Sequence, residues 1–343
     1  MSTTEQPASN AESLEVASSR VHPELAGRAR FLPRSVGRTF LRVARILGRL
    51  IPHPRMPAGV HSSVVHVPGR DAGTAVRIRT YRPEGLRQPA PALLWIHGGG
   101  YVLGRPEQDA RTCIHFAREL GIVVVAVAYR HAPEHPFPAA LDDCHAALRF
   151  LRVNAAEWGI DASRIAIGGA SAGGGLTAGL AQRVRDVDPV QPVFQLLVYP
   201  MIDDRTTMRP VVPHARPPLW TDVENLFGWS SYLGRTPSHD EPPPHAVPAR
   251  RGDLAGLPPA WVGVGTIDLF HEENVAYASR LVEHGVPCEL VVVPGAYHGF
   301  DVVSPGADVT RSFVRSQVDA LRSALFPNDS GEIARAEHSS ARG

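Results

Sequence analysis

From residue 60 onward, apolar strand-like runs alternate with stretches of helical periodicity. The strand-like runs span residues 61–67, 75–82, 92–97, 122–129, 164–168, 193–199, 260–265 and 288–293. The helical stretches span residues 107–120, 137–158, 171–187, 271–284 and 308–325. Alternation of this length is typical of an open, mostly parallel sheet that carries helices on both faces. We therefore predict an α/β fold with an eight-stranded sheet.

Two parts of the chain depart from this alternation. Only turns separate runs 61–67 and 75–82, so we expect a leading antiparallel hairpin. The stretch 203–253 is rich in proline, which excludes a central strand. Since it follows the end of a strand, we predict an insertion with one or two short helices above the carboxyl edge of the sheet. Residues 57–203 and 251–326 then form the core, and residues 204–250 the insertion.

The two ends of the chain have different compositions. Residues 1–20 and 327–343 are polar and aperiodic, so we expect disordered tails. Residues 28–56 contain eight arginines, no acid and apolar residues near helical spacing, which predicts a basic amphipathic helix. Two interpretations of this helix are open: it packs on the rest of the protein, or it binds a membrane surface. No secretory signal is expected, and the longest apolar run, 122–129, is far shorter than the ~18 residues of a membrane span.

The charged residues and cysteines exclude several classes of function. Lys+Arg is 35 and Asp+Glu is 34, and this balance does not suggest a nucleic-acid partner. Every basic residue is arginine, which excludes Schiff-base lysines, P-loop lysines and Ser-Lys dyads. The three cysteines form no CxxC pair, so we expect a cytoplasmic protein without a disulfide scaffold.

Ser171 is the candidate nucleophile. It stands in the pattern G-x-S-x-G at 169–173, after the strand-like run RIAIG and at the start of a helical stretch. In this strand–turn–helix context the pattern is typical of a nucleophile elbow, whose strained turn exposes the serine oxygen at the sheet edge. The alternative is a glycine-rich turn without a function.

A second candidate element is the sequence HGGGY at 97–101, which directly follows a strand-like run. Consecutive glycines present backbone N–H groups that no side chain obstructs, as an oxyanion hole requires. Together with the Ala172 N–H, they predict such a hole. A phosphate-binding loop is the alternative, but neither a Walker lysine nor the G-x-G-x-x-G spacing is present.

Asp268 and His298 each follow a later strand-like run. The order Ser171, Asp268, His298 is the chain order of the triad in the α/β-hydrolase fold. We expect His298 to take the serine proton and Asp268 to orient the imidazole. Glu272 and Glu273 are the alternative candidates for the acid.

Five segments together resemble the bacterial hormone-sensitive-lipase family of esterases. They are HGGGY at 97–101, YRHAPEHPFPAALDDC at 129–144, GGASAGGGL at 168–176, GTIDLF at 265–270 and YHGF at 297–300. The resemblance extends over residues 60–326. Two positions depart from the family pattern, because Ala170 stands where Asp is frequent and Leu269 stands where Pro is frequent.

The resemblance implies carboxylic-ester hydrolysis and a helical cap built from residues 1–56 and the insertion 204–250. It also implies that Gly99, Gly100 and Ala172 donate to the oxyanion, with Gly98 shaping the turn and His97 supporting the loop. Tyr101, Trp220 and Phe227 are candidate pocket residues, with a purely structural role as the alternative. His131 and His135 have helical metal spacing, but the intervening prolines forbid a continuous helix, and we predict no metal site.

The sequence as a whole predicts a serine carboxylesterase that forms an acyl-enzyme. It would need no cofactor or metal and would act on short to medium uncharged esters. A deacetylase or acyltransferase with the same triad is the nearest alternative, and a non-catalytic ligand receptor on this fold is the alternative from another class. A homodimer is left open.

Overall fold

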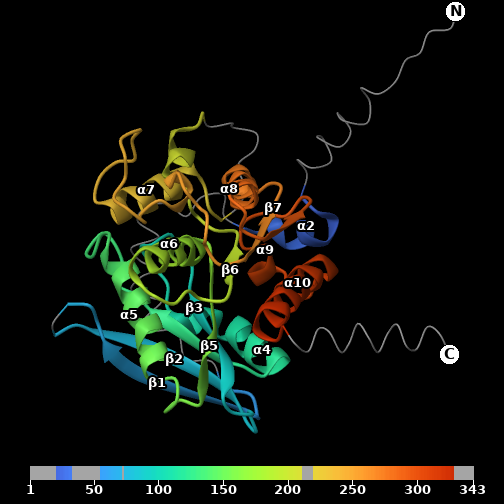
Figure 1. The fold of residues 1–343 in the computed structure, drawn as a ribbon. Coiled ribbons are helices and arrows are strands. Elements are labelled where there is room, and N and C mark those ends of the chain that lie inside the picture. The colour runs from blue at the N-terminus through green and yellow to red at the C-terminus, as the bar shows by residue number, and fades with distance from the viewer. Residues whose placement is uncertain (1–20, 33–54, 72, 211–218, 328–343) are drawn as a thin grey trace, which may run out of the picture.

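The computed structural model describes residues 21–32, 55–71, 73–210 and 219–327. Eight strands form one sheet in the order β1-β2-β4-β3-β5-β6-β7-β8 (Figure 1). The strands are β1 (Val60–Pro68), β2 (Ala75–Pro83), β3 (Ala90–Ile96), β4 (Val123–Ala128), β5 (Ile160–Ala170), β6 (Gln195–Val198), β7 (Ala260–Gly265) and β8 (Cys288–Val293). The predicted eight-stranded α/β architecture is therefore confirmed.

The leading hairpin is also confirmed. β1 pairs antiparallel with β2, with Val60 opposite Pro83, and β2 pairs antiparallel with β4. From β4 to β8 every neighbouring pair is parallel. The carboxyl ends of these parallel strands share one edge of the sheet, which is where α/β folds gather functional side chains.

Helices cover both faces of the sheet. They are α4 (Ala110–Leu120), α5 (Ala139–Val153), α6 (Ala172–Val187), α8 (His271–Glu283), α9 (Phe300–Val303) and α10 (Asp308–Leu325). Successive residues of β3 face opposite sides: Leu94 belongs to the core under α5, α6 and α8, whereas Trp95 belongs to the core under α4 and α10. Trp95 packs edge-on against Phe116 of α4. This alternation gives the sheet two separate hydrophobic cores.

The described part of the proline-rich insertion contains three helices, where the sequence predicted one or two. They are the 3-10 helices η2 (Asp204–Met208) and η4 (Pro248–Arg250) and the α-helix α7 (Asp222–Leu233). Thr221 and Glu224 form a capping box at the start of α7, which satisfies backbone N–H groups that the first turn leaves without partners. Within the described part of the insertion there is no strand.

Some predicted boundaries were wrong. β5 begins at Ile160 rather than at residue 164, because Ile160 pairs with Ala90 of β3. The helix predicted over 137–158 is shorter, since α5 ends at Val153. The helix predicted from residue 107 begins instead as the 3-10 helix η1 (Pro106–Asp109).

The N-terminal segment is described only in part. A helix that the sequence did not predict, α2 (Pro23–Ala29), buries Leu25 completely, and Arg28 donates to the Val303 carbonyl over 2.7 Å. Most of the predicted helix over 28–56, the predicted tail 1–20 and all of the predicted tail 327–343 except Pro327 lie outside the described residues. No helix in the described ranges has the length and apolarity that crossing a membrane requires.

Candidate active site

Ser171 lies on a strained turn between β5 and α6. Its backbone angles are φ 56° and ψ −123°, a conformation that L-residues rarely adopt. The turn is possible because Gly173 follows: a β-carbon there would overlap the carbonyl oxygen of Ile96. The strand–turn–helix context predicted from the sequence is therefore the local structure around this serine.

His298 lies between Ser171 and Asp268. Its Nε2 is 2.9 Å from Ser171 Oγ, and its Nδ1 is 2.8 Å from Asp268 Oδ2. All three side chains are buried. When Nδ1–H donates its hydrogen bond to the carboxylate, Nε2 of that imidazole tautomer is the unprotonated nitrogen that faces the serine hydroxyl.

Neighbouring groups hold the acid and the imidazole in place. The Phe270 N–H donates to Asp268 Oδ1 over 2.9 Å, which leaves the other carboxylate oxygen for the histidine. The rings of Tyr199 and Phe270 meet the His298 ring edge-on, with centroids 4.8 and 5.1 Å away. These contacts restrict the rotation of both side chains.

Neither of the alternative acids contacts His298. Glu272 is exposed and pairs with Arg209 over 2.6 Å. Glu273 is buried and accepts hydrogen bonds from the Ile202 and Asp203 N–H groups over 2.8 and 3.2 Å. Burial raises the pKa of Glu273 well above its usual value. Glu273 thus ties α8 to the chain segment that follows β6.

The three glycines of 98–100 lie beside the serine turn. A β-carbon at Gly98 would lie 3.3 Å from the Ser171 β-carbon, so the two loops are adjacent. Among the described residues, no group accepts a hydrogen bond from the N–H of Gly99, Gly100 or Ala172. Ala172 is the first residue of α6, where such an N–H has no partner within the helix. Three unused donors therefore lie close to the serine.

His97 holds the glycine loop in place. Its Nδ1 donates to the Gly98 carbonyl over 2.8 Å, and its ring stacks on Tyr129 with centroids 4.3 Å apart. Burial lowers the pKa of His97 to about 3, so the ring is neutral near pH 7. Gln108 also contacts this loop, because its Nε2 donates to the same carbonyl over 3.3 Å. No motif in the sequence pointed to Gln108.

The three candidate pocket residues lie in different environments. Trp220 is buried with its ring against Gly100. Tyr101 is also buried, donates to the Met201 carbonyl over 2.7 Å and stacks on Tyr232. Phe227 is half-buried and packs against the same core. Trp220 therefore lies against one of the residues that carry the unused backbone donors.

The HAPEH segment lies in a turn. Arg130, the residue before this segment, donates to Asp143 of α5 over 2.8 Å, which fixes the turn to that helix. Across the described residues, no three His, Cys, Asp or Glu side chains are grouped so that they could hold a metal ion.

A serine, a histidine and a carboxylate in line at the edge of a doubly covered sheet define the hydrolase class. Residues 93–302 match the family described as alpha/beta hydrolase fold. The chain belongs to this family, in the group of bacterial hormone-sensitive-lipase-like esterases that the sequence motifs indicated.

Curated relatives and solved structures agree with this assignment. Esterase LipI of Mycobacterium tuberculosis is 36% identical over 255 residues, covering 74% of this chain and 79% of that protein. Carboxylesterase NlhH of the same species is 38% identical over 243 residues, covering 70% and 76%. The solved structure of a bacterial heroin esterase has a TM-score of 0.80 and 37% identity, covering 89% of this chain and 98% of that one. The chain is a carboxylic ester hydrolase.

Proposed function

We propose that Ser171, His298 and Asp268 form the catalytic triad of this esterase. The observation that carries the proposal is the position of the His298 ring, whose two nitrogens lie 2.9 Å from the serine oxygen and 2.8 Å from the carboxylate. This geometry suits general-base activation of a hydroxyl, with the carboxylate stabilising the imidazolium that forms.

The proposed reaction has two halves. Ser171 Oγ attacks the ester carbonyl while its proton passes to His298 Nε2. The tetrahedral intermediate then collapses to an acyl-enzyme, and the alcohol leaves with the proton from the imidazolium. Water, deprotonated by His298, releases the acid in the same manner and restores the serine hydroxyl.

The oxyanion hole is proposed at Gly99, Gly100 and Ala172. Their N–H groups are unused among the described residues, and they lie on the two adjacent loops that meet at the serine. Donors of this kind stabilise the charge that develops on the carbonyl oxygen, each by a few kcal/mol. His97 and Gln108 would fix the loop by holding the Gly98 carbonyl.

We further propose that residues 1–56 and 204–250 form a cap that limits the substrate to short or medium acyl chains. Trp220, from this insertion, already lies against Gly100. Removing residues 1–56 should then raise KM and blur chain-length selectivity on soluble esters. Unchanged ester kinetics, with a loss only of binding to anionic vesicles, would instead assign this segment to membrane binding.

Hydrolysis is tested with p-nitrophenyl esters of graded acyl length. Wild-type protein should release p-nitrophenol fastest from esters with short or medium acyl chains. The substitution Ser171→Ala should lower kcat by about four to six orders of magnitude. Ser163→Ala, which changes an exposed serine of β5, is the matched control and should keep wild-type rates. Transfer of the acyl group to an added alcohol would favour the acyltransferase alternative, and faster cleavage of amides than of esters would favour the deacetylase. A lack of turnover on every substrate would favour a ligand receptor.

A further inference from the structure

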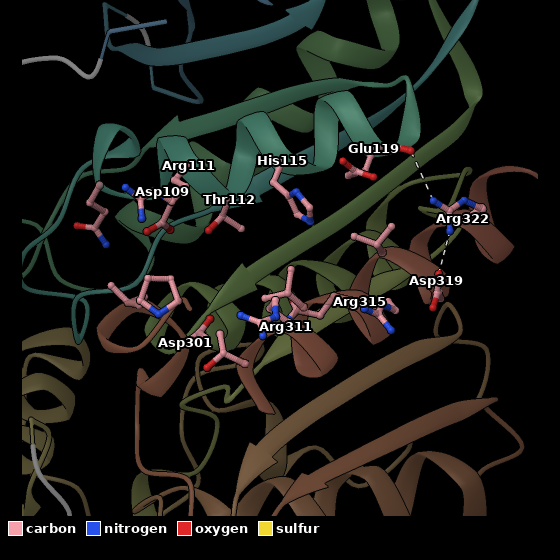
Figure 2. A pocket seen from close by; sticks show the side chains of 17 residues that line it. Asp109, Arg111, Thr112, His115, Glu119, Asp301, Arg311, Arg315, Asp319 and Arg322 are labelled. Carbon is pink, nitrogen blue, oxygen red and sulfur yellow. Dashed lines mark hydrogen bonds and ion pairs between the residues drawn. The ribbon is translucent and has the colours of Figure 1, made fainter. Parts of the chain in front are cut away.

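A cavity of about 840 Å³ lies between α4 and α10, on the face of the sheet that these helices cover (Figure 2). The two helices run side by side (Figure 1), and Arg322 of α10 reaches the Glu119 carbonyl at the end of α4. A cavity of this size accommodates a small organic ligand. It includes neither Ser171 nor His298.

Arginine and histidine side chains line both walls of this groove. Arg111 and His115 are four residues apart on α4, and Arg311 and Arg315 are four residues apart on α10, so each pair shares one helix face. His115 points from α4 towards α10 in Figure 2. No carboxylate among the described residues pairs with Arg111 or Arg315. Arg311 pairs with Asp308 on its own helix. The guanidinium groups of Arg111 on one wall and Arg315 on the other favour an anion between the two helices.

The interior of the groove also suits an amphiphilic anion. Three valines of the lining are apolar: Val318 is buried, Val314 is half-buried and Val302 is exposed. Two buried donors that line the groove, Thr310 Oγ1 and Gln317 Nε2, lack a hydrogen-bond partner among the described residues. These side chains are only 1% and 2% exposed. A buried donor without a partner is costly, and a ligand oxygen would satisfy it.

The carboxylates that line the groove lie at its two ends. At one end, Asp109 accepts from Trp95 Nε1 over 2.8 Å, and Asp301 accepts from the Tyr199 hydroxyl over 2.9 Å. Burial raises the pKa of both acids, which disfavours negative charge there. At the other end Asp319 pairs with Arg322 over 2.8 Å, beside Glu119. Between these two ends, no carboxylate among the described residues lines the groove.

At the Asp109 and Asp301 end, residues of the groove contact both the glycine loop and a neighbour of His298. Gln108, which lines the groove, donates to the Gly98 carbonyl in the glycine loop. Asp301 holds the Tyr199 hydroxyl, and the Tyr199 ring packs against His298. A ligand that shifts Gln108 or Asp301 would thus move groups that contact the oxyanion loop and the imidazole.

We propose that this groove binds an alkyl carboxylate and that its binding alters turnover. The carboxylate would lie between the cationic side chains of α4 and α10, with the alkyl chain along the valines. Alkyl carboxylates are also the class of acid that ester hydrolysis releases, so the regulatory part rests on the proposed function. Binding does not depend on that function and is measured separately.

Binding is tested by calorimetry with sodium octanoate on the full-length protein. The double variant Arg111→Gln/Arg315→Gln should weaken one octanoate-binding event by about tenfold or more, because charged hydrogen bonds to the carboxylate are lost. Arg118→Gln, an exposed arginine on α4 outside the groove, is the matched control and should bind as wild type. The conservative pair Arg111→Lys/Arg315→Lys should retain most of the affinity and shows that charge is required.

Two results would overturn the binding site. Identical octanoate binding in wild type and in the glutamine variant would assign all binding to the catalytic pocket. Tighter binding of octylammonium than of octanoate at this groove would show that Asp109 and Asp301 select a cation instead. Both variants change exposed side chains, and an unchanged melting temperature confirms that they are folded.

Regulation is tested by steady-state kinetics with a short p-nitrophenyl ester. Octanoate should change kcat of the wild type in addition to raising KM, whereas in the glutamine variant only KM should rise. An unchanged kcat in the wild type would overturn the regulatory part. A lack of ester turnover in every protein would contradict the proposed function, and the calorimetric result would still decide whether the groove binds octanoate.

Discussion

The indole ring of Trp220 lies against Gly100, so that a β-carbon on residue 100 would overlap the ring. Gly100 also has a positive φ of 58°, which disfavours any other residue. The insertion therefore reaches the glycine loop at the point where an oxyanion would be held. In the proposed mechanism, this contact links access of the substrate to stabilisation of the oxyanion.

Gly100→Ala should lower kcat by about 10² to 10³, because the loop must move away from Trp220 and displaces an oxyanion donor. Gly121→Ala is the control. Its φ is 62°, but no atom lies within 4 Å of the added methyl group. That variant should lose about 1–2 kcal/mol of stability and keep wild-type kcat. Equal effects of the two substitutions on kcat would show that backbone strain, and not the overlap with Trp220, lowers kcat.

Trp220→Ala should shift selectivity towards longer acyl chains, because removing the indole opens space above the glycine loop. The measurement is the ratio of kcat/KM for p-nitrophenyl octanoate to that for p-nitrophenyl acetate. Trp158→Ala, which removes an indole packed on Phe150, is the control and should leave the ratio unchanged. An unchanged ratio in Trp220→Ala would remove this residue from the pocket.

Asp268→Asn should lower kcat by about 10⁴, because the amide no longer holds the imidazole in the required tautomer. Glu272→Gln is the matched control. It alters an exposed acid four residues along the chain whose carboxylate pairs with Arg209, and it should retain full activity. A large loss in Glu272→Gln, with near-normal turnover in Asp268→Asn, would reverse the assignment of the acid.

Asp109 should make stability depend on pH. Burial raises the pKa of Asp109 from 3.8 to about 6, so the folded protein binds this proton more tightly than the unfolded chain does. Its stabilising effect is complete below about pH 4 and is lost as the pH rises through about 6. Asp109→Asn removes this titration while keeping an acceptor for Trp95. The free energy of unfolding of this variant should therefore rise relative to wild type between these pH values, by up to about 3 kcal/mol.

Urea unfolding between pH 4 and 7.5 provides this measurement. Asp319→Asn is the control, because that carboxylate is exposed and pairs only with the exposed Arg322 among the described residues. Parallel curves for wild type and Asp109→Asn would contradict the raised pKa of Asp109.

The sequence predicted which segments form strands, and it predicted the candidate site, for the same physical reason. Parallel strands are nearly continuous in apolar residues, and Ser171, Asp268 and His298 each follow such a run within five residues. Strand ends converge at one edge, so local patterns were enough to place these residues together. Their catalytic roles stay predictions.

Features that depend on packing between distant segments could not be predicted in this way. The start of β5 depends on the pairing of Ile160 with Ala90, seventy residues earlier. Gln108 supports the Gly98 carbonyl from a short 3-10 helix that has no distinctive motif. The groove between α4 and α10 exists only once the two helices pack side by side, and arginines at helical spacing on each helix are also typical of an ordinary solvated face.

The most direct test of the proposed chemistry is to locate the covalent intermediate. A p-nitrophenyl alkylphosphonate mimics the tetrahedral intermediate and should attach once per chain, releasing one equivalent of p-nitrophenol. Mass spectrometry of the digested protein should place the adduct on Ser171, and both Ser171→Ala and His298→Ala should stay unlabelled. Stoichiometric labelling of another residue, or labelling of Ser171→Ala at the wild-type rate, would contradict the account.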